Sequence, residues 1–390
     1  MKGMGKKTLI GGALIIGSFS ALYFTLPPLT TTTYEVGSEK EIKAIAGTTT
    51  PEIKKEPEIV VTHLKTPEPL KAIYMTACVL GTPSWREKLA KMIDETELNA
   101  VVIDIKDYTG TIAYQPADPT LQSIQGTGCR TGDLKPFLAN LHARGIYTIA
   151  RVTVFQDPYY TKAHPELAVK RKSDGAVWRD RKGLSFIDVS AKPFWDYIVA
   201  LSHDAYAQGF DEINFDYIRF PSDGDMKDIA FPWTGTTTKT VALERFFEYL
   251  EREVKPSGVV ISADLFGMTT TNTDDLNIGQ VLEPALRHFD YVAPMVYPSH
   301  YPPKFNGWAN PNDHVYDVVK FSMDRAVLRA NAASTTPLKL RPWLQDFDYG
   351  GDYGAAEVRA QIQATYDAGL TSWMLWDPRN IYTKDALLTE

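Results

Sequence analysis

Eight short apolar runs alternate with amphipathic segments along most of the chain, and this alternation constrains the fold more than any other feature. Several runs are apolar almost throughout, as expected for parallel strands that are covered on both faces. The eight runs span residues 72–77, 100–105, 147–154, 212–220, 259–265, 291–296, 338–344 and 372–376. Strands that alternate with helices form a parallel sheet, so eight such units predict a single (β/α)8 TIM barrel, an α/β fold, over residues 71–390.

The segments between the runs carry apolar residues at helical spacing. In residues 192–208, for example, Phe194, Ile198, Leu201 and Ala205 follow one another at intervals of four, three and four. This spacing places them on one face of a helix. We therefore predict helices over residues 84–95, 133–144, 192–208, 241–254, 278–287, 313–332, 355–368 and 383–388.

The connections between these elements differ in length according to their direction. Helix-to-strand links are short, whereas strand-to-helix links are long and rich in polar and aromatic residues. The long links are residues 107–132, 156–191, 221–240, 267–277 and 298–312. Barrel enzymes build their active sites from the loops that follow the strands. The sequence thus predicts which end of the barrel carries the function.

The N-terminus combines Lys2, Lys6 and Lys7 with an apolar stretch over residues 9–27. A basic start followed by such a stretch is typical of an export signal. We predict a membrane-spanning signal anchor over residues 1–29, with the rest of the chain outside the cytoplasm. A cleaved signal peptide, which would release a secreted protein, stays open. Residues 30–70 mix Thr, Pro and alternating charge, which predicts a flexible linker with an optional short strand at 59–62.

The charge of the chain limits the classes of binding partner, and its cysteine content limits the number of disulfides. The net charge is −7, and no run of Lys or Arg lies in the body of the chain, so we expect no nucleic-acid partner. No cofactor and no obligate protein partner are predicted. Cys78 and Cys129 are the only cysteines and would allow one disulfide, but their spacing does not show that they meet.

Polar residues recur near the C-terminal ends of the predicted strands, although a polar group in a buried strand is costly unless it is paired or used. In the fourth strand side chains alternate, so an inward Asp216 places Asn214 one layer below it. Phe215 and Tyr217 would then pack outward, while Arg219 can turn into the barrel mouth. The acidic residues at the strand ends are Asp104, Asp216, Asp264, Asp346 and Asp377.

Two of these acids suit glycosidic cleavage, which needs one carboxyl group as acid and another as nucleophile or base. Asp216 and Asp264 lie on the fourth and fifth strands, and neighbouring strands are about 4.8 Å apart. They form our candidate catalytic pair. The alternative is that the strand-end acids only form ion pairs with Arg151, Arg219 or Arg341.

The segment GFDEINFDYIRFPSD at residues 209–223, with YMTA before it and YVAPMVYPSHY and WMLWDP after it, resembles a bacterial glycosyl hydrolase domain family of unknown function. That family belongs to the barrels that carry a D-Y-[IV]-R-[FY]-P strand. The resemblance covers residues 71–378 and implies a TIM barrel and carbohydrate hydrolysis. Distant likeness to α-amylase and α-galactosidase barrels implies that Asp216 is the nucleophile. It also implies that Asp264, where those amylases use Glu, is the proton donor.

The remaining polar and aromatic residues form a predicted binding set for a carbohydrate substrate. Asp104 and Arg151 would hydrogen-bond sugar hydroxyls, and Arg219 would keep Asp216 ionised by its positive charge. The aromatic side chains of Tyr297, Trp343 and Trp376 would provide stacking surfaces for sugar rings. Tyr217, Asp346 and Asp377, at the strand ends, would provide further contacts.

Other chemistries find less support. The seven His residues show no H-x-x-H or H-E-x-x-H spacing, so no metal site is predicted. No G-x-S-x-G elbow occurs. The serious rival is a non-catalytic glycan-binding or cell-wall scaffold protein on the same barrel. The presence of both Asp216 and Asp264 favours a glycoside hydrolase acting on an extracellular or cell-wall polysaccharide.

Overall fold

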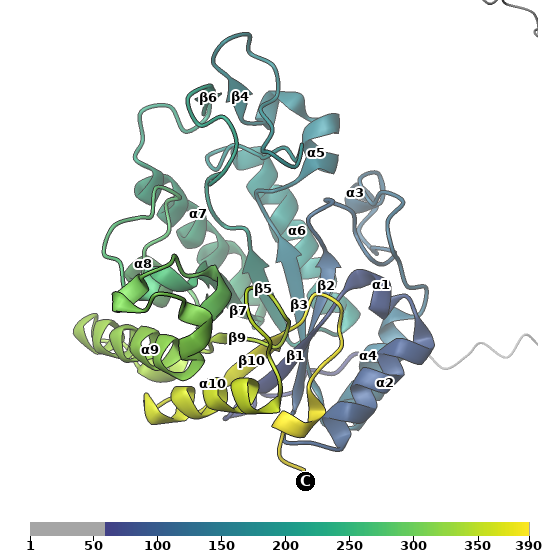
Figure 1. Cartoon of the computed structure of the whole chain (residues 1–390). Coiled ribbons are helices and arrows are strands. Elements are labelled where there is room, and N and C mark those ends of the chain that lie inside the picture. Colours follow the sequence, from purple (N-terminus) through teal and green to yellow (C-terminus); the bar gives the residue numbers. More distant parts are fainter. Residues whose placement is uncertain (1–58, 390) are drawn as a thin grey trace, which may run out of the picture. The chain divides into compact units, whose positions relative to one another are not determined.

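The computed structural model describes residues 59–389, which form a closed barrel of eight parallel strands with helices around it (Figure 1). The strand order around the barrel is β1-β10-β9-β8-β7-β5-β3-β2. Each barrel strand is therefore the neighbour of the barrel strand that follows it along the chain, and β10 closes the barrel against β1. The TIM barrel prediction is therefore confirmed. The barrel strands are β1 (Lys71–Met75), β2 (Ala100–Lys106), β3 (Tyr147–Thr153), β5 (Glu212–Asp216), β7 (Val260–Phe266), β8 (Tyr291–Met295), β9 (Trp343–Gln345) and β10 (Trp373–Trp376).

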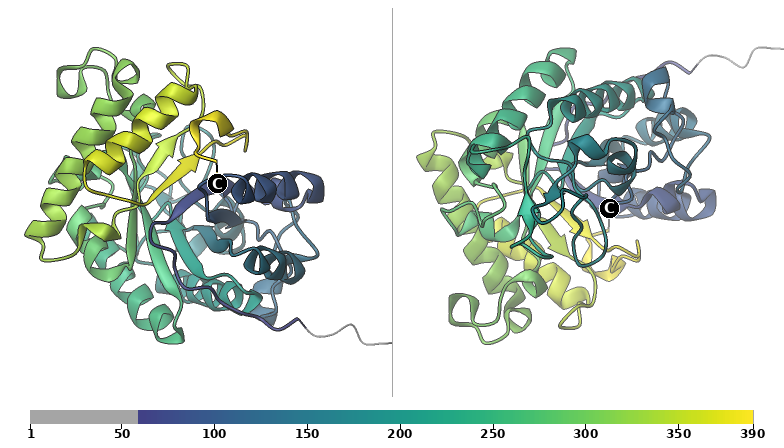
Figure 2. Two further views of the ribbon diagram at one scale, coloured as in Figure 1. Left: turned by 90° about the horizontal axis from the view of Figure 1, so that it is seen from below. Right: turned by 90° about the horizontal axis from the view of Figure 1, so that it is seen from above.

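The larger helices cover the outside of the barrel (Figures 1 and 2). Their apolar faces and the outward faces of the strands form one large core cluster. The helices are α1 (Ala77–Leu80), α2 (Pro83–Asp94), α3 (Pro119–Gln122), α4 (Leu134–Ala143), α5 (Pro158–Ala163), α6 (Lys192–Gln208), α7 (Lys239–Val254), α8 (Leu282–His288), α9 (Val315–Ala332) and α10 (Ala355–Asp367). The predicted helix over 192–208 is matched residue for residue by α6.

Several predicted elements differ from the structure, among them the strand predicted over 212–220, which ends at Asp216 as β5. The strand predicted over 338–344 is short, because Pro337–Lys339 forms a 3-10 turn and only Trp343–Gln345 pairs as β9. Pro342, which has no N–H to donate, precedes that pairing. The helix predicted over 278–287 begins only at Leu282, after Gly279 with φ of +85°. Near the C-terminus, the predicted helix over 383–388 is a single 3-10 turn at Lys384–Ala386.

Residues 59–70 pack against the lower end of the barrel (Figure 2, left), so the ordered domain begins before the predicted boundary at Lys71. The backbone N–H of Leu64 donates to Asp211 Oδ1 at 2.6 Å, and the His63 ring stacks on Tyr206 with 3.9 Å between ring centroids. Leu70 is fully buried. No strand forms at residues 59–62.

The predicted signal anchor and most of the predicted linker lie outside the described residues. Within residues 59–389, none of the helices is both long enough and apolar enough to cross a membrane.

Two features shape the loops above the barrel. Cys78 and Cys129 form a disulfide that joins α1 to the loop after β2. A two-stranded antiparallel sheet of β4 (Lys170–Arg171) and β6 (Ile229–Ala230) connects the loops after β3 and β5 at the top of Figure 1. Trp178, Phe186 and Ile229 give this upper region its own small apolar core.

Candidate active site

A cavity of about 320 Å³ opens at the C-terminal end of the barrel strands, the end that the long loops predict as functional. Its volume lies within the range of about 300 to 1,000 Å³ that is usual for small-molecule sites. Residues from β3, β5, β7, β8, β9 and β10 and the loops after them line it. They are Arg151, Asp216, Tyr217, Arg219, Asp264, Phe266, Gly267, Met268, Met295, Tyr297, His300, Tyr301, Trp343 and Trp376.

The strand register explains why two acids meet in this cavity. Arg151 of β3 pairs in register with Asn214 of β5, and Asn214 pairs with Ser262 of β7. Side chains alternate along a strand, so Asp216 and Asp264 each face the barrel axis one layer above Asn214 and Ser262. Because β5 and β7 are neighbours, the two carboxyl groups lie side by side at the same height.

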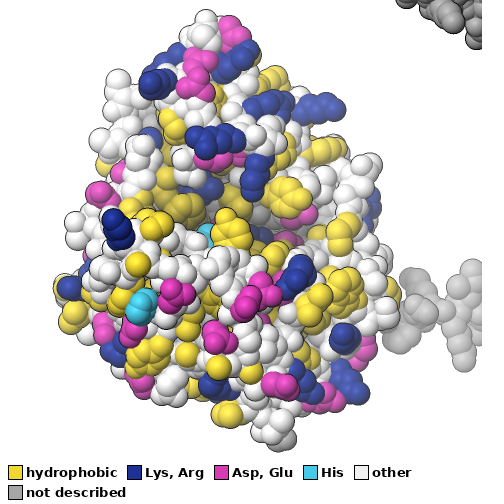
Figure 3. Space-filling model, viewed as in Figure 1, with side chains coloured by type: hydrophobic (Ala, Val, Ile, Leu, Met, Phe, Trp, Pro, Cys, Tyr) yellow, Lys and Arg dark blue, Asp and Glu magenta, His cyan; other side chains and the backbone are white. Residues whose placement is uncertain are grey.

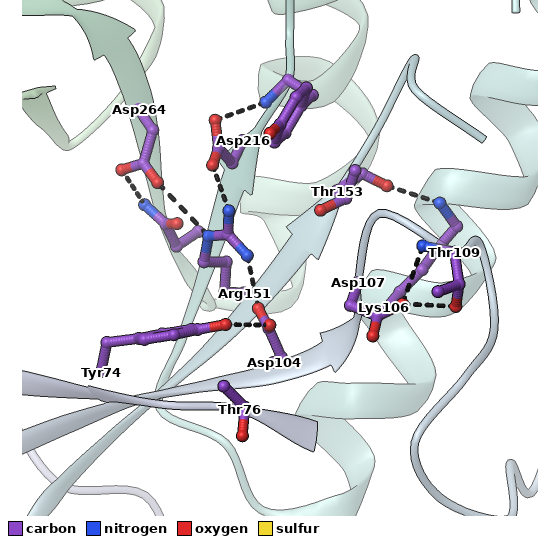
Figure 4. A network of polar contacts seen from close by, with 12 residues as sticks. Tyr74, Thr76, Asp104, Lys106, Asp107, Thr109, Arg151, Thr153, Asp216 and Asp264 are labelled. Atoms are coloured by element: carbon purple, nitrogen blue, oxygen red, sulfur yellow. Dashed lines mark hydrogen bonds and ion pairs between the residues drawn. The ribbon is translucent and has the colours of Figure 1, made fainter. Parts of the chain in front are cut away.

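Arg151 connects the acids from below (Figure 4). Its Nη1 donates to Asp104, its Nη2 donates to Asp216, and its Nε lies 3.7 Å from Asp264 Oδ2. Arg151 itself is buried, and its neighbouring carboxylates hold its pKa well above the usual range. One guanidinium therefore positions three carboxyl groups drawn from three different strands.

Asp264 is buried, and both of its hydrogen bonds come from neutral donors. Its Oδ1 accepts hydrogen bonds from Asn214 Nδ2 at 2.9 Å and from Trp343 Nε1 at 2.8 Å. Burial, with a smaller contribution from the negative charge of Asp216, raises the pKa of Asp264 to about 8. Asp264 is thus a carboxylic acid that keeps its proton at neutral pH.

Asp216 has a different environment. It forms an ion pair with Arg151, and its Oδ1 accepts a hydrogen bond from the backbone N–H of Tyr217 at 2.5 Å. Tyr217 has φ of +52°, which ends the strand and breaks the alternation. The expectation that Tyr217 packs outward is therefore wrong, because its side chain lines the cavity.

Aromatic side chains frame the two acids. Trp376 stacks on Tyr74 with 3.8 Å between ring centroids, and the Arg151 guanidinium carbon lies 4.9 Å from the Trp376 ring centroid. Trp343 is fully buried and meets Trp376 edge to face. Tyr297, which follows β8, packs in the same cluster as Trp343 and also lines the cavity. All three predicted stacking residues therefore reach the cavity.

Three predicted binding residues lie outside the cavity lining. Asp104 lies beside Arg151 on the neighbouring strand β2, where it accepts hydrogen bonds from Arg151 and from Tyr74. Asp346 accepts hydrogen bonds from the backbone N–H and the hydroxyl of Thr383, and burial raises its pKa to about 7. Asp377 is fully buried and accepts from the backbone N–H of Arg379. In the structure these three acids orient other groups of the chain.

Arg219 forms no direct ion pair with Asp216, the acid whose charge it was predicted to stabilise. Arg151 forms the ion pair with Asp216, while Arg219 lines the cavity without an ion pair to any residue of the described region. The reason is the register, because Arg151 points inward one layer below Asp216 whereas Arg219 follows the end of β5.

Sequence reasoning missed several residues in the cavity wall and next to it. Tyr74, which stacks on Trp376 outside the cavity lining, belongs to a mostly apolar strand. Phe266 is the last residue of β7, and Met268 and Tyr301 come from the loops after β7 and β8, where no periodicity predicts the direction of a side chain. The length of those loops was the only available signal. Among residues 59–389, no group of three or more His, Cys, Asp or Glu side chains is arranged to hold a metal ion.

A family model described as "Putative glycosyl hydrolase domain" matches residues 72–382. The chain belongs to this glycosyl hydrolase domain family. The match covers the barrel strands from the second residue of β1 onward and all of the cavity residues. No curated protein matches the chain.

Solved structures similar to this family member include a hypothetical protein from Ruminiclostridium thermocellum ATCC 27405. It is 32% identical over 53% of this chain and 98% of its own, with a TM-score of 0.46. The PgaB (BpsB) glycoside hydrolase domain from Bordetella bronchiseptica is 15% identical over 79% of this chain and 94% of its own, with a TM-score of 0.58. An α-galactosidase from Thermus thermophilus, in complex with stachyose, is 11% identical over 83% and 65%, with a TM-score of 0.50. At 15% and 11% identity, the similarity to the last two structures shows a shared fold alone.

Proposed function

We propose that the protein is a glycoside hydrolase that acts on an extracellular or cell-wall polysaccharide. Asp264 would be the general acid, and Asp216 the nucleophile or base. One observation carries the proposal: two carboxyl groups line the same cavity in different environments, one protonated at neutral pH and the other paired with a guanidinium. Environments that separate two carboxyl groups in this way divide the acid and base roles of a glycosidase.

The contacts of Asp264 support its role as acid. Its Oδ1 already accepts two N–H donors, so the proton of the neutral acid resides on Oδ2. Donation of that proton to the glycosidic oxygen would leave a carboxylate. Asn214, Trp343 and the nearby Arg151 Nε would stabilise this negative charge.

Asp216 would act on the anomeric carbon, directly or through a water molecule. Its two oxygens are held by Arg151 and by the backbone N–H of Tyr217, so the carboxylate has little freedom to rotate. A fixed orientation of this kind lowers the entropy cost of reaching the transition state. The Trp376 ring, with its partly exposed face, suits the apolar face of a sugar ring.

The proposed location outside the cytoplasm rests on two features. The basic and apolar N-terminus is typical of an exported protein. The disulfide between Cys78 and Cys129 suits an oxidising compartment. A membrane anchor over residues 1–29 would keep the barrel close to the cell envelope.

A release assay tests the proposal. The protein and its Asp216→Asn and Asp264→Asn variants would be incubated with α- and β-linked polysaccharides and cell-wall glycans. We expect release by the wild type and a loss of about 100-fold or more in each variant. Asp94→Asn, at the surface beside Arg144, is the control and should retain full activity. Glycan binding without release would instead make the protein a non-catalytic glycan binder.

The pH dependence gives a second readout. The acid role requires protonated Asp264, and its pKa of about 8 places the loss of activity on the alkaline side. We expect kcat/KM to fall as pH rises through about 8. A profile that stays flat through this range would contradict the assignment of Asp264 as the acid.

A further inference from the structure

Arg219 is a buried cation in the cavity wall. It follows the end of β5, its exposed fraction is 7%, and its guanidinium faces the same cavity as Asp216 and Asp264. Nη1 donates to the backbone oxygen of Phe220 at 3.0 Å and to Ser222 Oγ at 3.3 Å. Both of these acceptors are neutral.

No carboxylate of the described residues lies within ion-pair distance of the Arg219 guanidinium. In the described part of the chain Arg219 forms no ion pair, and its Nε and Nη2 make no hydrogen bond with another residue. Asp180, Asp216 and Asp223 are near enough to influence its pKa, but burial dominates and lowers that pKa. Asp180 is already engaged, because its Oδ1 accepts from the backbone N–H groups of Lys182 and Leu184. Arg151, by contrast, binds two carboxylates directly.

Aromatic rings surround the Arg219 guanidinium. Its central carbon lies 4.9 Å from the ring centroid of Phe266, 5.1 Å from that of Tyr217 and 6.0 Å from that of Phe186. Cation–π contacts of this kind stabilise a cation partly, but they leave its N–H donors unsatisfied. The rings also keep the guanidinium in one place, ready to bind an acceptor that enters the cavity.

The loop above the cavity carries positive charge. Between Asp157 and Ala191 the chain has seven Lys or Arg residues, although the whole chain has a net charge of −7. Of the five acidic residues in this segment, only Glu166 and Asp174 are exposed. Figure 3 shows Lys and Arg side chains over the upper part of this face, around the β4–β6 region, with fewer Asp and Glu side chains among them. Such a field attracts an anionic polymer toward the cavity.

We propose that the substrate is an acidic polysaccharide, and that Arg219 determines this specificity by binding an oxyanion carried by the sugar. This inference rests on the proposed function and specifies its substrate class. The planar fork of a guanidinium pairs with carboxylate or phosphate oxygens, so a uronic acid and a phosphorylated sugar are the two sources of that anion. A neutral sugar would leave the buried charge of Arg219 unpaired.

Binding of monosaccharides tests the proposal without relying on cleavage, because a monosaccharide has no glycosidic bond to another sugar. D-Glucose, D-glucuronate and D-glucose 6-phosphate differ only at C6, and D-galactose with D-galacturonate repeats the comparison on a second ring. Affinities would be measured by ligand-observed NMR at constant ionic strength, for the wild type and for Arg219→Gln and Arg219→Lys. Arg245→Gln, which removes one exposed charge on α7, is the matched control.

We expect the wild type to bind one of the anionic sugars at least about tenfold more tightly than the neutral sugar. Arg219→Gln should lose that preference, and Arg219→Lys should keep part of it. Whether glucuronate or the phosphate is preferred identifies the source of the anion. Equal affinities in the wild type, or a preference that survives in Arg219→Gln, would overturn the proposal.

The outcomes separate this inference from the proposed function. Polysaccharide cleavage without a preference for anionic sugars removes the role of Arg219 alone. A preference for anionic sugars without cleavage leaves the role of Arg219 and removes the hydrolase. If Arg219→Gln does not fold, the affinities of the wild type and of Arg219→Lys for anionic and neutral sugars still test the role of Arg219.

Discussion

Asp264→Asn is expected to stabilise the fold while it removes the proposed catalytic acid. The amide resembles the neutral carboxylic acid in shape, and its carbonyl oxygen can accept the same hydrogen bonds from Asn214 Nδ2 and Trp343 Nε1. It differs from the native side chain in having no charge at any pH. The variant therefore isolates the free energy that the protein loses by ionising Asp264 in a buried site.

The sign of the effect follows from the pKa, which burial raises from 3.8 to about 8. Between these values the folded protein holds a proton that the unfolded chain has released, so the stabilising contribution is complete below pH 3.8 and is lost as pH rises through about 8. The loss is about 1.4 kcal/mol per pH unit. Relative to the wild type, Asp264→Asn should be more stable by about 4 kcal/mol near pH 7.

Urea unfolding of the two proteins at about pH 5, 7 and 9 measures this difference. It should grow between the first two conditions and level off above about pH 8. Asp94→Asn, in the exposed pair with Arg144, should change stability by less than about 1 kcal/mol at every pH. If Asp264→Asn is no more stable than the wild type near pH 7, or the difference does not depend on pH, the reasoning about Asp264 is wrong.

Three further changes test the supporting structure. Arg151→Met removes the cation shared by buried carboxylates and should lower the free energy of unfolding by about 3–5 kcal/mol in urea titrations. Lys106→Met should cost a similar ~3–5 kcal/mol, because Asp157 is fully buried 2.9 Å from the lysine Nζ, and adding Asp157→Asn should recover most of that loss. Cys78→Ser opens a cross-link spanning 51 residues and should lower stability by about 2–4 kcal/mol, seen as a lower Tm.

The barrel and the catalytic candidates could be predicted because they depend on local pattern. Each buried parallel strand appears as an apolar run, and α6 appears as a helical periodicity with the same bounds as in the structure. Asp216 and Asp264 stand out because an acid at the end of an apolar run has no reason to be there unless it is paired or used. The strand ends all meet at one rim, so position along the chain was enough to bring these two residues together.

The partners of those acids could not be predicted in the same way. Arg151 and Arg219 are both cations near strand ends, and the sequence left both open as ion-pair partners of the acids while assigning the charge beside Asp216 to Arg219. The register of β3 against β5 instead places Arg151 beneath Asp216. The backbone at Tyr217, with φ of +52°, changes the direction of the chain at the point where alternation would have predicted the opposite face.

The sequence by itself therefore determined the closed barrel, its functional end and the two acids at the rim, because each depends on periodicity within a short segment. Only the tertiary structure decided which acid keeps its proton and which cation is left unpaired. Both depend on burial and on contacts between residues far apart in the chain, such as Trp343 with Asp264, 79 positions away. Electrostatic interactions in a buried site are set by distances of a few ångströms, and those distances exist only after the strands have closed into a barrel.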